Sequence, residues 1–245
     1  MAINVMKRYE LKYLLDPAQT AFLRERLKGH MEPDEYGRTT IASLYYDTPS
    51  RQLIRASLEK PEFKEKIRLR SYGPAGPDSP VFLELKRKAF GIVYKRRVET
   101  RVPQAESFFA GAEGKLCSCG QIDRELAAFR DHYRTLEPSC LVIYDRTAYC
   151  EKDGDLRLPI DENPRYRTER LTLEGPMDGK LLLDPGWTIL EVKVQEAVPL
   201  WLAAILSEGK ITKSSFSKYG EAYCREMLQK KEKTLLYGRT MPKSA

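Results

Sequence analysis

Long apolar segments and a secretory leader are both missing from this sequence of 245 residues. No run of about 18 apolar residues occurs, so the sequence predicts no membrane-spanning helix. The opening segment, MAINVMKRYE, contains neither the apolar stretch nor the cleavage site of a signal peptide. These absences favour a soluble, cytoplasmic protein.

Cysteine and histidine are too few and too scattered for the sites that they commonly form. The five cysteines are irregularly spaced, which favours reduced thiols over a disulfide framework: Cys117, Cys119, Cys140, Cys150 and Cys224. The two histidines, His30 and His132, are not placed like zinc ligands. No Ser-His-Asp or Cys-His set is evident either, so catalysis by a nucleophilic side chain is not indicated.

Positive charge is abundant instead. The 42 Lys and Arg against 35 Asp and Glu give a formal net charge of +7, and the isoelectric point is near 9.0. This balance favours an anionic partner, without choosing between nucleic acid, membrane surface, phosphate and nucleotide. The length suits one large domain, which we place at residues 1–228, followed by a basic, flexible tail at residues 229–245.

Helix and strand patterns alternate along the chain. Helices are predicted at residues 16–30, 49–60, 103–111, 123–136, 198–208 and 217–231, the first beginning with Asp16 as its cap. Strands are predicted at residues 7–15, 39–47, 63–72, 81–89, 92–102, 139–149, 155–162 and 187–195, with a weaker one at 170–175. This order favours an α+β protein whose antiparallel sheet of about eight strands closes into a barrel flanked by helices.

One predicted strand carries a cation at every second position. In FKEKIRLRSY, residues 63–72, the side chains of Lys64, Lys66, Arg68 and Arg70 share one face, because successive side chains of a strand point to opposite sides. Most of the other predicted strands repeat the alternation of charged and apolar residues. Cations clearly outnumber acids on these charged faces.

Two arrangements fit this pattern: a sheet with one charged face in water, or a barrel with a charged interior. A solvated face usually mixes Lys and Glu in cross-strand pairs, so the excess of cations favours the barrel. Cations that face one another repel, and we therefore expect an anion between them. Phosphate chains fit, since arginine binds phosphate oxygens with two parallel hydrogen bonds. Nucleic acid is not expected, because the aromatic residues lie mainly on the apolar faces.

Several motifs together resemble the polyphosphate polymerase (VTC) domain family of the triphosphate tunnel metalloenzyme, or CYTH-like, superfamily. They are, in chain order, Arg8-x-Glu10-x-Lys12-Tyr13, Arg68-x-Arg70, LELKRK, YKRRV, YDRTAY, LRLPID, ILEVKV and SFSKYG, and they span about residues 7 to 228. The resemblance implies an antiparallel tunnel that binds triphosphate with a divalent metal. It also implies transfer of the ATP γ-phosphoryl group onto a growing polyphosphate chain.

The resemblance and the charged faces together give the expected site. We expect catalytic contacts from Arg68, Arg70, Lys86, Arg146 and Lys218. We expect substrate-binding contacts from Lys12, Lys66, Lys95, Arg97, Arg157, Lys193, Ser217 and Tyr219. Mn²⁺ or Mg²⁺ would be held by Glu191 with Glu10 or Glu84. Two alternatives stay open: Glu10 and Glu84 only orient their cationic neighbours, and SFSKYG only caps the last helix.

The reaction itself stays open between three hypotheses: a polyphosphate polymerase, a tripolyphosphatase or nucleoside triphosphatase, and a polyphosphate-binding domain without catalysis. Arg8 stands where the hydrolase branch of the superfamily has the first Glu of its Glu-x-Glu-x-Lys motif, which favours the VTC branch. The expected partners are ATP, triphosphate or polyphosphate. Product export would need a separate membrane partner.

Overall fold

The computed structural model describes residues 9–90, 92–112, 116, 120–151 and 154–238, with side chains up to residue 229. The strands are β1 (Tyr9–Leu15), β2 (Glu32–Asp47), β3 (Phe63–Tyr72), β4 (Val81–Ala89), β5 (Ile92–Thr100), β6 (Glu137–Cys150), β7 (Arg157–Arg167), β8 (Lys180–Leu181), β9 (Thr188–Val194) and β10 (Lys213–Ser214). The helices are α1 (Pro17–Leu27), α2 (Gln52–Leu58), α3 (Val102–Phe109), α4 (Gly120–Tyr133), α5 (Leu200–Glu208) and α6 (Lys218–Gly238).

The strands form one 10-stranded antiparallel sheet in the order β10-β1-β9-β7-β6-β2-β3-β4-β5, and β8 pairs with β7 off this path. The predicted α+β class and antiparallel sheet are confirmed. The predicted closure into a barrel is corrected, because the sheet is open between β10 and β5 in the described part of the chain. The physical reason is that β10 has only two residues and pairs with β1 alone, so it cannot carry a ladder to the far edge.

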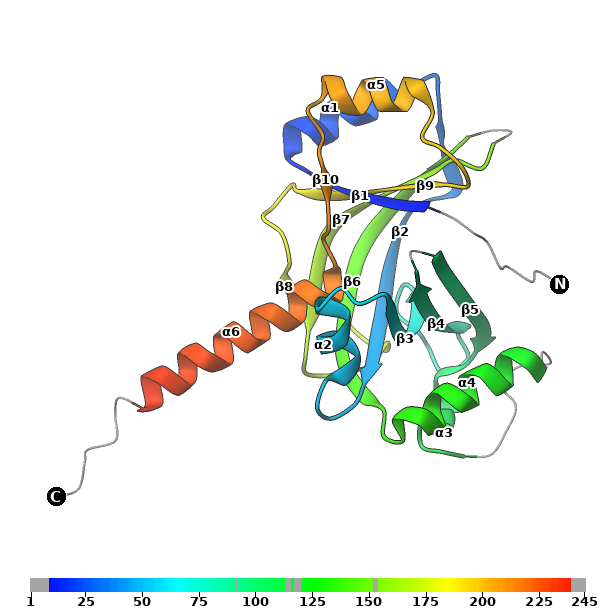
Figure 1. Cartoon of the computed structure of the whole chain (residues 1–245), viewed down its shortest axis with the longest axis vertical. Helices are drawn as coiled ribbons and strands as arrows, with labels where there is room; N and C mark the ends of the chain where they lie inside the picture. Colours follow the sequence, from blue (N-terminus) through cyan, green and yellow to red (C-terminus); the bar gives the residue numbers. More distant parts are fainter. Residues whose placement is uncertain (1–8, 91, 113–115, 117–119, 152–153, 239–245) are drawn as a thin grey trace.

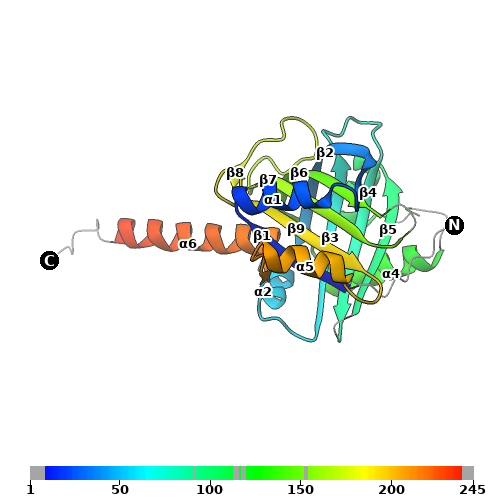
Figure 2. The ribbon, with the colours of Figure 1, turned by 90° about the horizontal axis from the view of Figure 1, so that it is seen from above.

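Side chains, not backbone, join the two ends of the curved sheet. Strands β1 and β9 lie across the long strands β2, β6 and β7, and β3, β4 and β5 form the other arm (Figures 1 and 2). The Nζ atom of Lys86 on β4 donates a hydrogen bond to Oε2 of Glu10 on β1 at 2.6 Å. Charged side chains of the two arms therefore meet across the inner face of the sheet.

Helices cover the outer, apolar face in two groups. Apolar residues of β2, β3 and β4 pack with α3 and α4, around Leu83, Phe108 and Phe129. Apolar residues of β1, β7 and β9 pack with α1 and α5, around Leu23 and Leu202. Helix α1 begins as predicted, with the Asp16 carboxylate accepting from the backbone N–H of Gln19 at 2.8 Å. These helices pack on the apolar face, so the charged face of the curved sheet lies on its inner side.

The start of α6 fills one end of the inner face. Tyr219 is 3% exposed and stacks on Tyr45 of β2, with ring centroids 4.4 Å apart. Its hydroxyl donates to Oδ2 of Asp47 at 2.8 Å and lies 2.8 Å from Oγ of Ser139. Asp47 also accepts from the backbone N–H of Leu53 at 2.9 Å, so one buried carboxylate ties α2 and α6 to the end of β2.

The structure departs from the predicted elements at several places. Helix α6 continues to Gly238, past the predicted boundary at residue 228, and projects from the rest of the molecule (Figures 1 and 2). The Lys, Glu and Leu residues beyond the boundary are good helix formers. Residues 170–175 form no strand, and the short strands β8 and β10 were not predicted. Cys117 and Cys119 lie outside the described residues.

Candidate functional site: a cationic face opposite a carboxylate cluster

The inner face of β3, β4 and β5 carries rows of cations. The strand register places Lys66 opposite Lys86 and Lys86 opposite Lys95. The next row is, in order, Arg68, Glu84 and Arg97. Like charges directly opposite one another destabilise a sheet, so the first row costs stability while no anion is bound. We call Lys66, Arg68, Arg70, Glu84, Lys86, Lys95 and Arg97 the β3–β5 face.

Glu84 lies at the centre of the β3–β5 face and is 1% exposed. Its Oε2 accepts a hydrogen bond from Nε of Arg68 at 2.8 Å, and its Oε1 lies 2.6 Å from Nζ of Lys95. Nη1 of Arg70 lies 3.6 Å and Nε of Arg97 3.8 Å from the same carboxylate. One buried carboxylate therefore fixes the positions of four cations.

The charge states of the β3–β5 face follow from this packing. Burial raises the pKa of Glu84, but Arg68, Arg70 and Lys95 outweigh burial and hold that pKa well below its usual value. Burial lowers the pKa of Lys95 to about 8, although Glu84 opposes the shift. Glu84 is therefore ionised at neutral pH, and a further anion beside Lys95 would favour its charged form.

Glu191 on β9 is the centre of a second group. The residue is 9% exposed, and its carboxylate lies 3.2 Å from Nζ of Lys193, 3.7 Å from Nζ of Lys12 and 3.8 Å from Nη2 of Arg146. Burial raises the pKa of Glu191, but Lys193, Lys12 and Arg146 hold it well below the usual value. Glu191 is therefore a carboxylate at neutral pH.

Asp161 on β7 lies beside Glu191 and is fully buried. Its two oxygens accept hydrogen bonds from Nε and Nη2 of Arg146 at 2.6 and 2.9 Å, and it also pairs with Lys218 at the start of α6. Burial lowers the pKa of Lys218, but Asp161 and then Glu191 raise it above the usual value. We call Glu10, Lys12, Arg146, Asp161, Glu191, Lys193 and Lys218 the Glu191 cluster.

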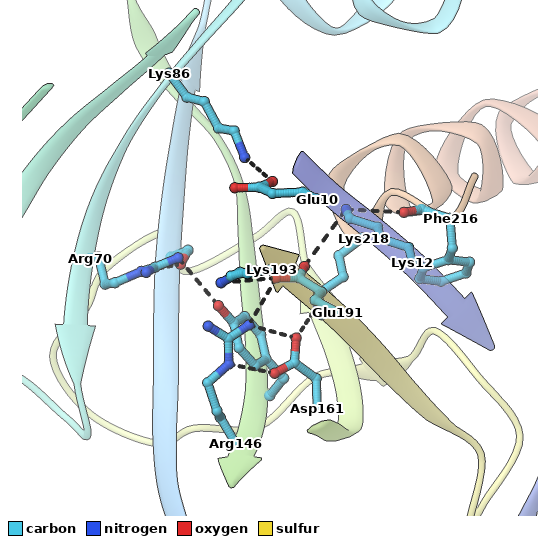
Figure 3. A network of polar contacts seen from close by, with 12 residues as sticks. Glu10, Lys12, Arg70, Lys86, Arg146, Asp161, Glu191, Lys193, Phe216 and Lys218 are labelled. Carbon is cyan, nitrogen blue, oxygen red and sulfur yellow. Dashed lines mark hydrogen bonds and ion pairs between the residues drawn. The ribbon is translucent and has the colours of Figure 1, made fainter. Parts of the chain in front are cut away.

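Two contacts connect the β3–β5 face with the opposite side of the site. Lys86 points at Glu10, and Arg70 reaches across β2 toward β6 (Figure 3). Nη2 of Arg70 donates to the hydroxyl of Tyr144 at 3.2 Å. Burial raises the pKa of Tyr144, but the charges of Arg70 and Arg146 outweigh burial, so the pKa lies below its usual value. The two charged groups thus form one continuous polar site.

Lys66 differs from the other cations of the site. Its Nζ lies 3.4 Å from Oγ of Ser217, and no acidic side chain pairs with it among the residues that the structure describes. Burial, and then the charges of Lys12, Lys64, Lys86 and Arg68, lower its pKa to about 7. The charged form of a buried lysine that has no carboxylate partner becomes favourable only when an anion approaches.

Ser217 and Tyr219 have structural partners. The backbone N–H of Gly220 donates to Oγ of Ser217 at 3.3 Å, which makes Ser217 the cap of α6. The hydroxyl of Tyr219 is held by Asp47 and Ser139. The structure therefore favours the capping alternative for SFSKYG, while Ser217 also accepts from Lys66.

Two arginines named in the sequence analysis, Arg157 and Arg8, are not placed among the other cations of the site. Arg157 lies opposite Lys193 at the start of β7, on the same face, but its side chain is exposed at the rim of the site. Arg8 lies outside the described residues. The structure brings together all the other cations that the sequence predicts for the site, from six strands and the start of α6.

The VTC domain model of protein families matches residues 7–226 of the chain. The chain belongs to the VTC domain family. This match confirms the resemblance that the sequence motifs indicate. The VTC domain has no match among curated proteins.

Solved structures share the fold of this VTC domain. A proposed adenylate cyclase of Vibrio parahaemolyticus is similar at a TM-score of 0.53 and 14% identity, over 90% of this chain and 99% of that chain. A proposed adenylate cyclase of Bacillus halodurans is similar at a TM-score of 0.52 and 14% identity, over 86% and 96%. At this level of identity the likeness shows a shared fold. None of the described helices of the VTC domain is both long and apolar enough to span a membrane.

The carboxylates of the VTC domain fit a divalent metal ion in part. Glu10 lies opposite Lys193 and Glu191 opposite Lys12, so the two carboxylates are diagonal neighbours on paired strands. Mg²⁺ or Mn²⁺ takes one or two carboxylates together with phosphate oxygens and water, which this pair can supply. No group of three His, Cys, Asp or Glu side chains that could hold a metal occurs within the described ranges. The site therefore suits an ion that binds mainly through its ligand's oxygens.

Glu84 does not fit the predicted role of metal ligand in this VTC domain. Both of its oxygens lie within 2.8 Å of cationic nitrogens, and the side chain is buried. This position fits the alternative, charge pairing that orients Arg68 and Lys95. The reason lies in the register, which inserts Glu84 between Arg68 and Arg97.

Sequence reasoning missed Asp161 and Tyr144 as members of the site. Both stand on charged faces of predicted strands, so the alternation alone marks them. Their importance comes from partners far along the chain, Lys218 for Asp161 and Arg70 for Tyr144. The adjacency of two predicted strands along the chain could have indicated a further pair, Arg146 with Asp161, which lie directly opposite each other.

Proposed function

We propose that the protein is a polyphosphate polymerase-like phosphotransferase, which binds ATP and transfers its γ-phosphoryl group to a polyphosphate chain. The observation that carries this proposal is the β3–β5 face, which holds six cations and a single carboxylate, Glu84. This excess of positive charge faces the Glu191 cluster. The ion pair between Lys86 and Glu10 connects the two surfaces directly. A chain of phosphates supplies the missing negative charge at regular intervals.

The proposed chemistry needs alignment and charge stabilisation. Phosphoryl transfer passes through a loose transition state with charge on the equatorial oxygens, and preorganised cations stabilise that charge. Arg68 and Arg70 are held by Glu84 before the substrate arrives, so little reorganisation is needed. A Mn²⁺ or Mg²⁺ ion held by Glu191 and Glu10 would neutralise charge on the phosphate oxygens.

The state of the carboxylates favours transfer over hydrolysis. Glu84 and Glu191 have pKa values well below the usual value, because cations outweigh burial at each of them. Such carboxylates are weak bases and would deprotonate water poorly. A terminal phosphate is already ionised near neutral pH, since its second pKa is about 6, so it can attack without a general base. Arg8, in place of the hydrolase branch's Glu, agrees with this preference.

Hydrolysis of triphosphate on the same site is the second candidate. It would use the same cations, and the shared tunnel fold supports it as much as transfer. The two reactions differ only in the acceptor, water or phosphate. The acceptor therefore has to be identified from the products.

The experiment incubates the protein with ATP and Mn²⁺, with and without a short polyphosphate primer, and resolves the phosphate products by length. We expect chains longer than the primer, with ADP formed in proportion. Free phosphate or shortened chains would replace the polymerase by a hydrolase. Tight binding without any turnover would leave a binding domain.

A further inference from the structure

An exposed aromatic side chain continues the row of cations on β3. Lys66, Arg68, Arg70 and Tyr72 occupy alternate positions, and their partners on β2 and β4 show no register shift. The four side chains therefore share the inner face over about 20 Å of strand. Tyr72 is 47% exposed, whereas Arg70 next to it is 6% exposed. The row thus ends at the rim of the site with an accessible ring.

Tyr72 is held in place by two neighbours. Its ring packs edge-on against Phe82, with centroids 5.7 Å apart and an interplanar angle of 77°. Nη2 of Arg97 donates to the hydroxyl of Tyr72 at 3.3 Å, and the guanidinium carbon of Arg97 lies 3.7 Å from the Phe82 ring centroid. Phe82 and Arg97 stand on the same inner face, one row apart, on β4 and β5. Tyr72 is therefore ordered while part of its ring remains free.

We propose that Tyr72 is the nucleobase platform of the site, and that the base of a nucleoside triphosphate stacks on its ring beside Arg97. The proposal rests on the proposed function, because it takes the row Arg70, Arg68 and Lys66 as the binding site of the phosphates. Aromatic rings and guanidinium groups stack on any base through its π-face. The platform therefore takes purine and pyrimidine nucleotides alike.

The platform also fixes the direction of the bound nucleotide. With the base at Tyr72, the phosphates run along β3 past Arg70 and Arg68, and the terminal phosphate points toward Lys66. Lys66 lies next to Ser217 at the start of α6, where Lys218 and the Glu191 cluster stand. The γ-phosphate thus reaches the end of the site that is farthest from the rim.

The test compares ATP with inorganic tripolyphosphate, which has the phosphates but no base. Dissociation constants are measured by calorimetry for the unaltered protein, Tyr72→Ala, Tyr72→Phe and the control Tyr94→Ala. Tyr94 is an exposed tyrosine of β5 opposite Arg87, on the outer face. We expect Tyr72→Ala to weaken ATP binding about 5- to 150-fold, the effect of losing one stacked base. Tyr72→Phe and Tyr94→Ala should leave ATP binding nearly unchanged.

Tripolyphosphate affinity separates this inference from the proposed function. We expect Tyr72→Ala to bind tripolyphosphate as the unaltered protein does. Equal ATP affinity in Tyr72→Ala and the unaltered protein would overturn the base platform and leave the phosphate site standing. Loss of both ligands in Tyr72→Ala would also overturn it, because the ring would then support the site itself. Failure of the unaltered protein to bind either ligand would overturn the proposed function instead.

Discussion

The two charged surfaces that face each other differ in their balance of charge. The β3–β5 face holds six cations and one carboxylate, whereas the Glu191 cluster holds four cations and three carboxylates. The cations of the β3–β5 face therefore repel one another in the free protein, and a bound anion would relieve this repulsion. The second is almost neutral and already paired. Under the proposed function, we expect the β3–β5 face to capture phosphate and the Glu191 cluster to position the reacting groups.

The largest expected effect comes from Glu191→Gln, which keeps the shape of the side chain and removes its charge. If Glu191 holds a metal ion, turnover should fall at least about 100-fold, while polyphosphate binding without metal persists on the β3–β5 face. Steady-state turnover and metal-free binding of the same variant separate the two surfaces. Normal metal-dependent turnover would remove Glu191 from the site and leave it as a partner of Lys193.

Arg68→Ala and Arg70→Ala test the other surface. The two arginines lie about 6.6 Å apart along the strand, far enough to contact different phosphates. We expect the catalytic rate to drop about tenfold or more in each variant, with partial rescue by Lys, because an ammonium group cannot make two parallel hydrogen bonds. Kinetics with circular dichroism as a folding control measure this. Complete rescue by Lys would show that only charge matters there.

Lys66 predicts how pH changes the binding of triphosphate. Its pKa is lowered to about 7, so its charge is lost as the pH rises above 7, and affinity for tripolyphosphate should fall about tenfold from pH 6.5 to about 8.5. An arginine stays charged over this range, so Lys66→Arg is the matched control with a flatter profile. Equal slopes in both proteins would contradict the prediction. The facing groups are Lys12, Lys64, Arg68, Lys86, Ser217 and Tyr219.

The same shift has the opposite sign for stability. Between about 7 and the usual lysine pKa of about 10.4, the unfolded chain binds more protons than the folded one at this residue. The contribution of Lys66 to the free energy of unfolding therefore rises with pH across this window. Ligand binding and stability should thus respond to pH in opposite directions.

The smallest effect is expected at Lys64, the first cation of the β3 row. It lies opposite Lys88 and donates to the backbone carbonyl of Ser57 at 3.4 Å, away from Glu84 and Glu191. Lys64→Ala should weaken capture only a few-fold, and added salt should remove most of the difference. Binding at two salt concentrations measures this. A loss as large as that of Arg68→Ala, and insensitive to salt, would place Lys64 inside the catalytic site.

The strand period of two explains how much of this site the sequence could predict. It was sufficient to place Arg68, Arg70, Lys86 and Lys193 on charged faces, because side-chain direction in a strand depends on local geometry alone. It could not predict that Glu84 is enclosed by cations, since this depends on the register of three strands. Arg96, which interrupts the apolar face of β5, has its explanation on α4, where Glu125 accepts from its Nε at 2.9 Å.

The remaining differences between the predicted and the observed structure depend on tertiary contacts. The open sheet follows from the length of β10, and a strand of two residues gives no sequence pattern. The role of Tyr219 depends on Asp47, which lies 172 residues earlier in the chain. Buried hydroxyl partners of this kind have no periodic signature, so a motif such as SFSKYG could not distinguish a helix cap from a phosphate contact.

The most direct test of the central claim measures whether the inner face of the sheet binds a chain of phosphates. The melting temperature is recorded with tripolyphosphate, and with sulfate and chloride at matched ionic strength. At a concentration 100 times its dissociation constant, tripolyphosphate should stabilise the folded protein by about 2.7 kcal/mol, far more than either salt. An equal rise with sulfate or chloride would contradict the account, because the charged faces would then be ordinary solvated surface.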